Sequence, residues 1–189
     1  MKYFTLAIYH SGDECDNDAP LFEAFRQYTQ HLSAMKGVLP DDIRALAHLP
    51  GVDDGLIVRV EVDHAAQELK LTIRCGDLIM GYYDLVLIYE GFSISAEHNG
   101  ILAWAARSTG NNRPNVPDLA FHEIDRISDG RIDHRILFHP GAWFAITCAN
   151  LRWQKIERPD RKLPRFRDRY PGGPPALNPL PAATPTPLD

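Results

Sequence analysis

The sequence predicts one α+β domain, in which two N-terminal helices pack on a curved, mainly antiparallel β-sheet of about seven or eight strands. Two observations predict this fold class. Apolar residues recur every three or four positions before residue 50, and every second position after residue 55. The 44% hydrophobic content is enough to bury one core. A proline-rich end follows, so we expect the domain to cover residues 1–157 and a basic, extended Pro-rich tail to cover residues 158–189.

The N-terminal third predicts a strand and then two helices. Residues 2–9 are aromatic and apolar, which is typical of a strand. Residues 21–35 carry the apolar stripe of an amphipathic helix, and residues 40–49 predict a shorter helix that begins at a proline and ends before Pro50-Gly51. The residues of the longer helix that we expect to face the sheet are Phe22, Phe25 and Leu32.

The rest of the domain predicts strands. Alternating apolar residues indicate a hairpin over residues 55–74, and residues 82–95 predict a long strand with a bend at Gly91. Residues 118–153 predict a three-strand meander, because Asp-Gly and Pro-Gly turns interrupt the apolar alternation. In this meander we expect residues 142–153 to form one strand.

Charge is divided unevenly along the chain. Residues 151–189 carry eight Lys/Arg and four Asp/Glu, which leaves twelve and twenty-one for residues 1–150, so the body has a charge of −9 and the tail of +4. An acidic body argues against nucleic-acid binding and suits a basic protein partner. Acidity for solubility alone is the simpler alternative. The carboxylates that we expect to bind such a partner are Asp53, Asp54, Glu90 and Glu97.

Several classes of function are excluded by missing patterns. No apolar run is long enough for a membrane helix, and the first residues lack a signal-peptide pattern, so we expect a cytoplasmic protein without membrane contact. Cys15, Cys75 and Cys148 have no CxxC spacing, which indicates reduced thiols and not a zinc site. Neither a GxSxG elbow nor a phosphate-binding loop is present. We therefore expect no catalytic residue, metal or cofactor.

One cluster of ionisable residues could line a pocket on the sheet. The segment from residue 121 to residue 139 is rich in His, Asp and Glu on strands that we expect to be adjacent. Side chains alternate along a strand, so His122 and Glu123 should face opposite ways. Ordinary charge pairs across the strands are the simpler reading of this segment. The candidate pocket residues are His122, Glu123, His134 and Trp143.

The order of these segments resembles an uncharacterised bacterial family, a domain of unknown function, over residues 1–157. The start MKYFT fits it, as does HRILF at residues 134–138 in a pattern of the type DEI…G…EHRILF. Where the family has Leu-His-Asp before the first hairpin, this chain has Val52, Asp53 and Asp54, so Asp53 replaces that histidine and the resemblance assigns it no role here. The other matching residues are Tyr9, Tyr28, His31, Leu32, Leu39, Pro40, Ile43, Leu46, Leu85, Leu87, Tyr89, Glu123 and Asp125.

The resemblance implies an immunity protein, because proteins of this kind are often encoded near polymorphic toxins. We therefore expect a non-enzymatic cytoplasmic binding protein that occludes a cognate, possibly basic, toxin or effector. The alternative is a small-molecule-binding or hydrolytic domain that uses a pocket near His122 and His134. A pocket with convergent ionisable groups would favour the alternative, whereas a flat, acidic, partly apolar patch would favour occlusion.

Overall fold

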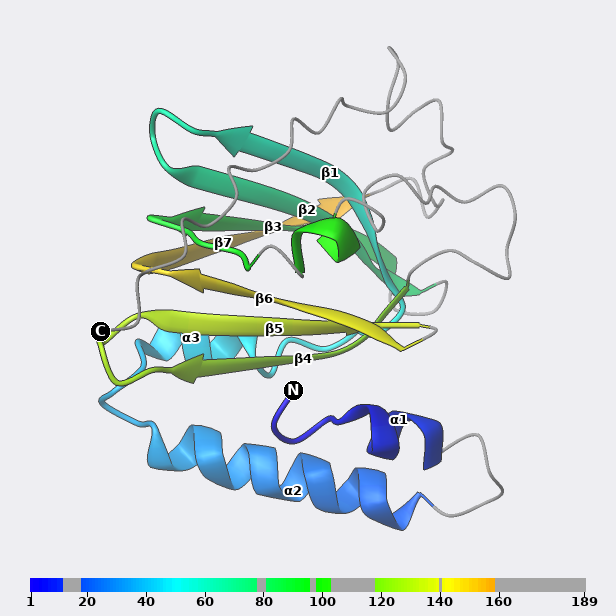
Figure 1. Cartoon of the computed structure of the whole chain (residues 1–189). Helices are drawn as coiled ribbons and strands as arrows, with labels where there is room; N and C mark the ends of the chain where they lie inside the picture. Colours follow the sequence, from blue (N-terminus) through cyan, green and yellow to red (C-terminus); the bar gives the residue numbers. More distant parts are fainter. Residues whose placement is uncertain (12–17, 78–80, 96–97, 103–117, 140, 159–189) are drawn as a thin grey trace.

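The computed structural model describes residues 1–11, 18–77, 81–95, 98–102, 118–139 and 141–158 (Figure 1). Residues 98–102 are helical in addition to the labelled elements. In the described part of the chain, no helix is both long and apolar enough to cross a membrane. The labelled elements are α1 (Leu6–Ser11), α2 (Ala19–Ala34), α3 (Asp41–Leu46), β1 (Gly55–Asp63), β2 (Glu68–Asp77), β3 (Gly81–Glu90), β4 (Asp118–Arg126), β5 (Ile132–Phe138), β6 (Ala142–Cys148) and β7 (Asn150–Arg158).

The strands form one antiparallel sheet in the order β6-β5-β4-β1-β2-β3-β7, which confirms the α+β class and the antiparallel sheet. Two meanders, β1-β2-β3 and β4-β5-β6, make up most of it. They are joined where β1 pairs with β4, and this pairing includes only Gly55 with Leu119 and Leu56 with Asp118. These are the first two residues of each strand, so β1 and β4 run in opposite directions away from this point and the sheet divides into two halves.

The two edge strands of the sheet follow each other in the chain. Strand β6 ends at Cys148 and β7 begins at Asn150, so Ala149 alone carries the chain from one edge to the other. A link of this length reaches only about 7 Å, so the sheet must curl until its edges are close. The Ala149 amide donates to the Glu90 carbonyl at 2.9 Å. The expected single strand over residues 142–153 is therefore wrong.

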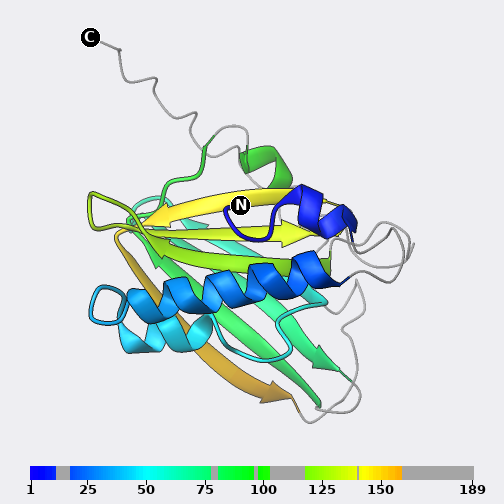
Figure 2. The same cartoon turned by 90° about the horizontal axis from the view of Figure 1, so that it is seen from below.

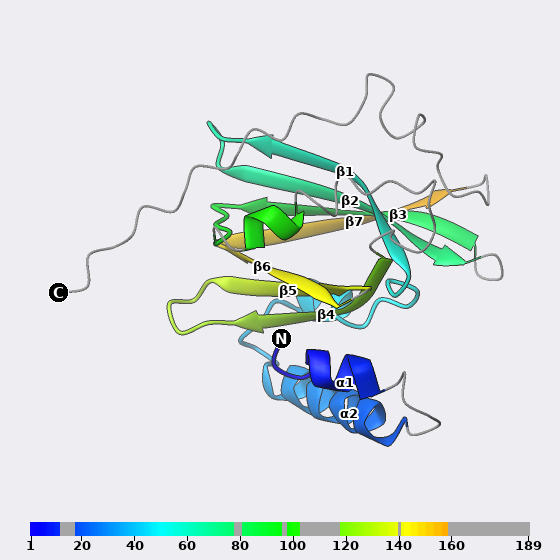
Figure 3. The ribbon, with the colours of Figure 1, turned by 45° about the vertical axis from the view of Figure 1, so that its right-hand side comes forward.

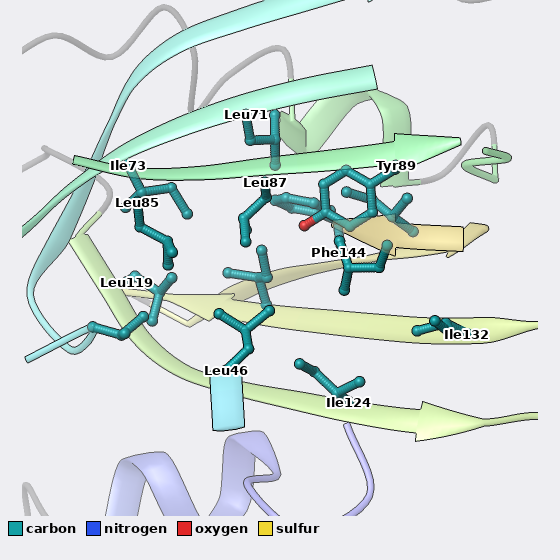
Figure 4. Close-up of a cluster of buried hydrophobic side chains, with 14 of the residues drawn as sticks. Leu46, Leu71, Ile73, Leu85, Leu87, Tyr89, Leu119, Ile124, Ile132 and Phe144 are labelled. Atoms are coloured by element: carbon teal, nitrogen blue, oxygen red, sulfur yellow. The ribbon is translucent and has the colours of Figure 1, made fainter. Parts of the chain in front are cut away.

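The concave side of the curled sheet holds the main core. Leu71, Ile73, Leu85 and Leu87 enter from one half and meet side chains of the other half (Figure 4). Helix α3 adds Leu46, which is fully buried among them. The core side chains of the second half of the sheet include Leu119, Ile124, Ile132, Ile136 and Phe144.

Helix α2 lies with α1 on the far side of β4 and β5 from the β1-β2-β3 half (Figures 2 and 3). Its buried residues are Ala24, Tyr28 and Leu32, four positions apart on one face. Leu32 is buried as expected, whereas Phe22 is 69% exposed, so its expected place against the sheet is wrong. Phe25 contacts Phe121 of β4, with ring centroids 5.9 Å apart, but stays 45% exposed. The apolar stripe is wider than the contact surface, and the phenylalanines lie at its margin.

Tyr28 also protects the free edge of β4. Its hydroxyl accepts a hydrogen bond from the Ile124 amide at 2.7 Å, which satisfies a strand N–H that β1 leaves unpaired. The same margin of β4 faces the pocket described below.

The first residues are not a strand, contrary to the expectation for residues 2–9. The amides of Lys2, Tyr3 and Phe4 converge on the carboxylate of Glu123, with shortest N–H···O distances of 2.8, 2.7 and 2.7 Å. Glu123 is 1% exposed and also accepts a hydrogen bond from Arg135 at 3.3 Å. The backbone donors that a strand would offer to a neighbour are thus used by one buried side chain.

Substituting Glu123→Gln should destabilise the protein. An amide has one acceptor oxygen in place of two and would direct an NH₂ group at backbone donors, so we expect a loss of roughly 3 kcal/mol or more in the free energy of unfolding. Denaturant unfolding measures this loss. The matched control is Glu157→Gln, on an exposed residue of β7, which should change stability by less than about 0.5 kcal/mol. Equal stability of the two variants would contradict the anchoring role.

Truncation after Arg158 should leave a cooperatively folded domain. Strand β7 pairs with β3 as far as Arg158, so the domain needs one residue more than the boundary expected from the sequence. Of the predicted Pro-rich tail 158–189, Arg158 belongs to β7, and residues 159–189 lie outside the described residues. A single thermal transition in the fragment 1–158 is expected. Loss of that transition would show that the later residues complete the core.

Candidate functional site

A cavity of about 320 Å³ lies beside β4, between α2 and the segment 47–53 that joins α3 to β1. It forms here because β1 begins opposite Leu119 and runs antiparallel away from it, so the backbone and side chains of β4 after Leu119 face an opening and not a neighbouring strand. The described residues of its wall are mostly apolar. They are Phe4, Phe25, Tyr28, Ala47, Leu49, Val52, Leu119, Ala120 and Phe121, with the polar Thr29, His48, Asp53 and His122.

Aromatic rings make one wall of the cavity. The rings of Phe4 and Phe121 are stacked, with centroids 4.8 Å apart and planes 13° from parallel. Phe25 packs edge-on against Phe4 at 4.9 Å and remains 45% exposed, so an apolar ring borders the opening. Phe4 holds this position because its amide is bound by Glu123.

Segment 47–53, the opposite wall, is held by hydrogen bonds from the sheet. The Tyr83 hydroxyl donates to the Pro50 carbonyl at 2.6 Å, and the Gly76 amide donates to the Gly51 carbonyl at 2.8 Å. Gly55 follows in a space without room for a side chain, since a Cβ there would lie 2.7 Å from the Val52 carbonyl oxygen. Both walls of the cavity are therefore anchored.

A chain of polar side chains leads from the cavity into the core. The Nδ1 atom of His122 lies 3.1 Å from Nε2 of His134, and Nδ1 of His134 lies 2.8 Å from the hydroxyl of Tyr89. His134 and Tyr89 are fully buried, whereas His122 is partly exposed where it lines the cavity. Figure 4 shows the Tyr89 hydroxyl directed into the core.

Burial sets the protonation states of these three hydrogen-bonded side chains, His122, His134 and Tyr89. It lowers the pKa of His122 to about 4, an effect that the nearby Glu123 opposes and that His48 adds to. Burial also sets the pKa of His134 well below its ordinary value, helped by His122, and raises the pKa of Tyr89 well above its ordinary value. At neutral pH both imidazoles are uncharged and the phenol keeps its proton.

Of the expected pocket residues, the structure brings His122 and His134 together. Glu123 faces the other side of β4, as strand alternation predicts, and holds residues 2–4. Trp143 also lies away from the histidine pair and packs against His98, with ring centroids 4.5 Å apart. Half of the expected set therefore belongs to the candidate site.

The expected acidic surface is not continuous. Asp53 borders the cavity and Asp54 is its neighbour in the turn before β1. Glu90 lies at the opposite end of the sheet, where it accepts hydrogen bonds from the side chains of Arg152 and Asn150. Glu97 lies outside the described residues. The described carboxylates of this set do not form one patch.

Sequence reasoning missed Tyr89, His48 and the aromatic wall. A signal existed for Tyr89, because a tyrosine inside the apolar run of residues 85–89 needs a partner for its hydroxyl once it is buried. No local signal marks Phe4, since its contacts depend on a strand more than a hundred residues later.

The groups that could perform covalent or metal chemistry are few near this site. Among the described residues, no three His, Cys, Asp or Glu side chains are arranged to hold a metal ion. Cys75 and Cys148 are buried, and burial raises the pKa of each thiol to about 12. These thiols are poor nucleophiles.

Comparisons of the chain with protein-family models, curated proteins and solved structures found no match. The resemblance to the bacterial domain of unknown function therefore stays a prediction.

Acidification should destabilise the protein through the two histidines. The folded pKa of His122 is about 4 against an ordinary 6.5, so between these values the unfolded chain binds more protons and a falling pH favours unfolding. From pH 7 to pH 5 we expect His122 to remove roughly 2 kcal/mol from the free energy of unfolding. His134 should act in the same direction.

Urea unfolding at the two pH values measures the effect. The variant His122→Gln should lose less stability on acidification than the wild type. His64→Gln, which alters an exposed histidine between β1 and β2, should behave like the wild type. An unchanged pH dependence in His122→Gln would contradict the role given to burial.

Proposed function

We propose that the protein binds an apolar, largely aromatic small molecule in the cavity between α2, segment 47–53 and β4. The observation that carries this proposal is an aromatic-walled cavity with one partly buried imidazole, backed by two fully buried polar groups. Small-molecule sites are typically apolar cavities of about 300 Å³ or more with a few placed polar groups. The cavity has this composition and size.

Binding is better supported than hydrolysis. An activated hydroxyl or thiol nucleophile is hydrogen-bonded to its base. Among the described residues, no hydroxyl or thiol is hydrogen-bonded to the imidazole of His122 or of His48. The hydrogen bond of the His122 ring goes to His134. The cavity can orient and shield a ligand without any of its described groups attacking it.

Occlusion of a toxin remains a second hypothesis, with the cytoplasmic location and basic partner that belong to it. It is supported by the charge of −9 on residues 1–150 and by the family resemblance. The occlusion hypothesis predicts a protein partner and does not require a cavity. The separation of the described acidic candidates gives it no preferred surface.

Two aromatic molecules of nearly the same size and shape, acetophenone and α-methylstyrene, test the pocket. Each has nine heavy atoms, so we expect dissociation constants on the order of 1 mM. Amide chemical shifts should change in residues 28–29, 47–49, 52–53 and 119–122, which line the cavity.

The variant Thr29→Trp should abolish these shifts, since Thr29 is exposed on α2 and lines the cavity. Its matched control is Gln30→Trp, the next residue of α2, which is exposed and does not line the cavity. Shifts that are the same in both variants, or that lie elsewhere on the protein, would refute the proposed site.

A further inference from the structure

The hydrogen bonds of Tyr89, His134 and His122 have a direction, and this direction determines what the cavity can recognise. Each neutral imidazole carries one N–H donor and one bare nitrogen acceptor. The two histidines are joined through His122 Nδ1 and His134 Nε2, so one of these atoms carries a proton and the other does not. Which one it is depends on Tyr89 at the buried end.

Tyr89 must donate its hydroxyl proton. Its side chain is fully buried, and its hydroxyl hydrogen bond in the described structure is the one with His134 Nδ1. A buried O–H that donates to nothing is strongly disfavoured. His134 Nδ1 is therefore the acceptor, which leaves the proton of that ring on Nε2.

The proton position on His134 in turn fixes the proton position on His122, at the cavity. His134 Nε2–H donates to His122 Nδ1, which is then bare, so the proton of His122 sits on Nε2. Nε2 is the remaining polar atom of the His122 ring. Of the three hydrogen-bonded side chains, His122 is the one that lines the cavity. The opposite direction would leave the Tyr89 hydroxyl proton without an acceptor among the described residues.

We propose that the cavity selects an aromatic molecule with a neutral carbonyl group, whose oxygen accepts a hydrogen bond from His122 Nε2. This inference rests on the proposed binding function and adds the ligand class. A neutral carbonyl fits better than a carboxylate, because Asp53 supplies the charged group among the described wall residues, and these include no Lys or Arg. A ligand that offers only donors would face the N–H of His122 without an acceptor.

Nitrogen chemical shifts of ¹⁵N-labelled histidine test the direction without any ligand. At pH 7 we expect His122 and His134 both to be protonated at Nε2 and bare at Nδ1. A proton on Nδ1 of His122, or a positively charged ring, would overturn the inference. In Tyr89→Phe the buried donor is lost, so both tautomers of His134 and His122 should appear. Tyr82→Phe, at another buried tyrosine of β3, should keep the wild-type pattern.

Relative affinity tests the ligand class. Acetophenone and α-methylstyrene differ by C=O in place of C=CH₂, and one hydrogen bond should favour acetophenone by about five- to tenfold. In Tyr89→Phe this ratio should fall towards one, while Tyr82→Phe retains it. Equal binding of both molecules to the wild type overturns the carbonyl preference and leaves the pocket in place. Tighter binding of benzoate than of acetophenone overturns the choice of a neutral ligand. If neither aromatic probe binds, the pocket fails and the ligand class fails with it.

Discussion

The fold depends on the one-residue passage from β6 to β7 at Ala149. Because these strands occupy opposite edges of the sheet, the passage forces the edges together, and Ser93 beyond β3 pairs with Thr147 of β6 at that end. The amide–carbonyl distances of this pairing are 2.7 and 3.0 Å. On the other side of the sheet, β1 and β4 share only two residue pairs. Helix α3 and segment 47–53 enter the resulting opening, and the cavity is what they leave unfilled.

Strand β4 connects the stability of the domain with the candidate site. Its alternating side chains send Glu123 to the outer face and His122 towards the cavity and His134. Glu123 holds the backbone of Phe4, whose ring stacks on Phe121 to form the aromatic wall. One strand therefore fixes the N-terminus, a wall of the pocket and its polar end. Changes that loosen the N-terminus should also reshape the pocket.

Local patterns in the sequence explain what could be predicted. The change of apolar period at residue 55 is sufficient for the α+β class, and the Asp-Gly turn is sufficient for the hairpin of β4 and β5. Alternation also separates His122 from Glu123. The unpredicted features depend on distant partners: residues 2–4 bind Glu123, and β7 crosses to β3 although no glycine or proline marks Ala149. The burial of α2 follows Tyr28 and not Phe25, because the position of the sheet and not the helix pattern selects the contact face.

The most direct measurement is mass spectrometry of what the protein carries when it is purified from its own cells. Wild type and Thr29→Trp would be isolated in parallel, denatured and extracted, and the extracts compared. We expect an aromatic carbonyl compound in the wild-type extract, at close to one molecule per chain, that is missing from the Thr29→Trp extract. Identical extracts together with a stoichiometric protein partner on both variants would contradict it and favour occlusion of a toxin.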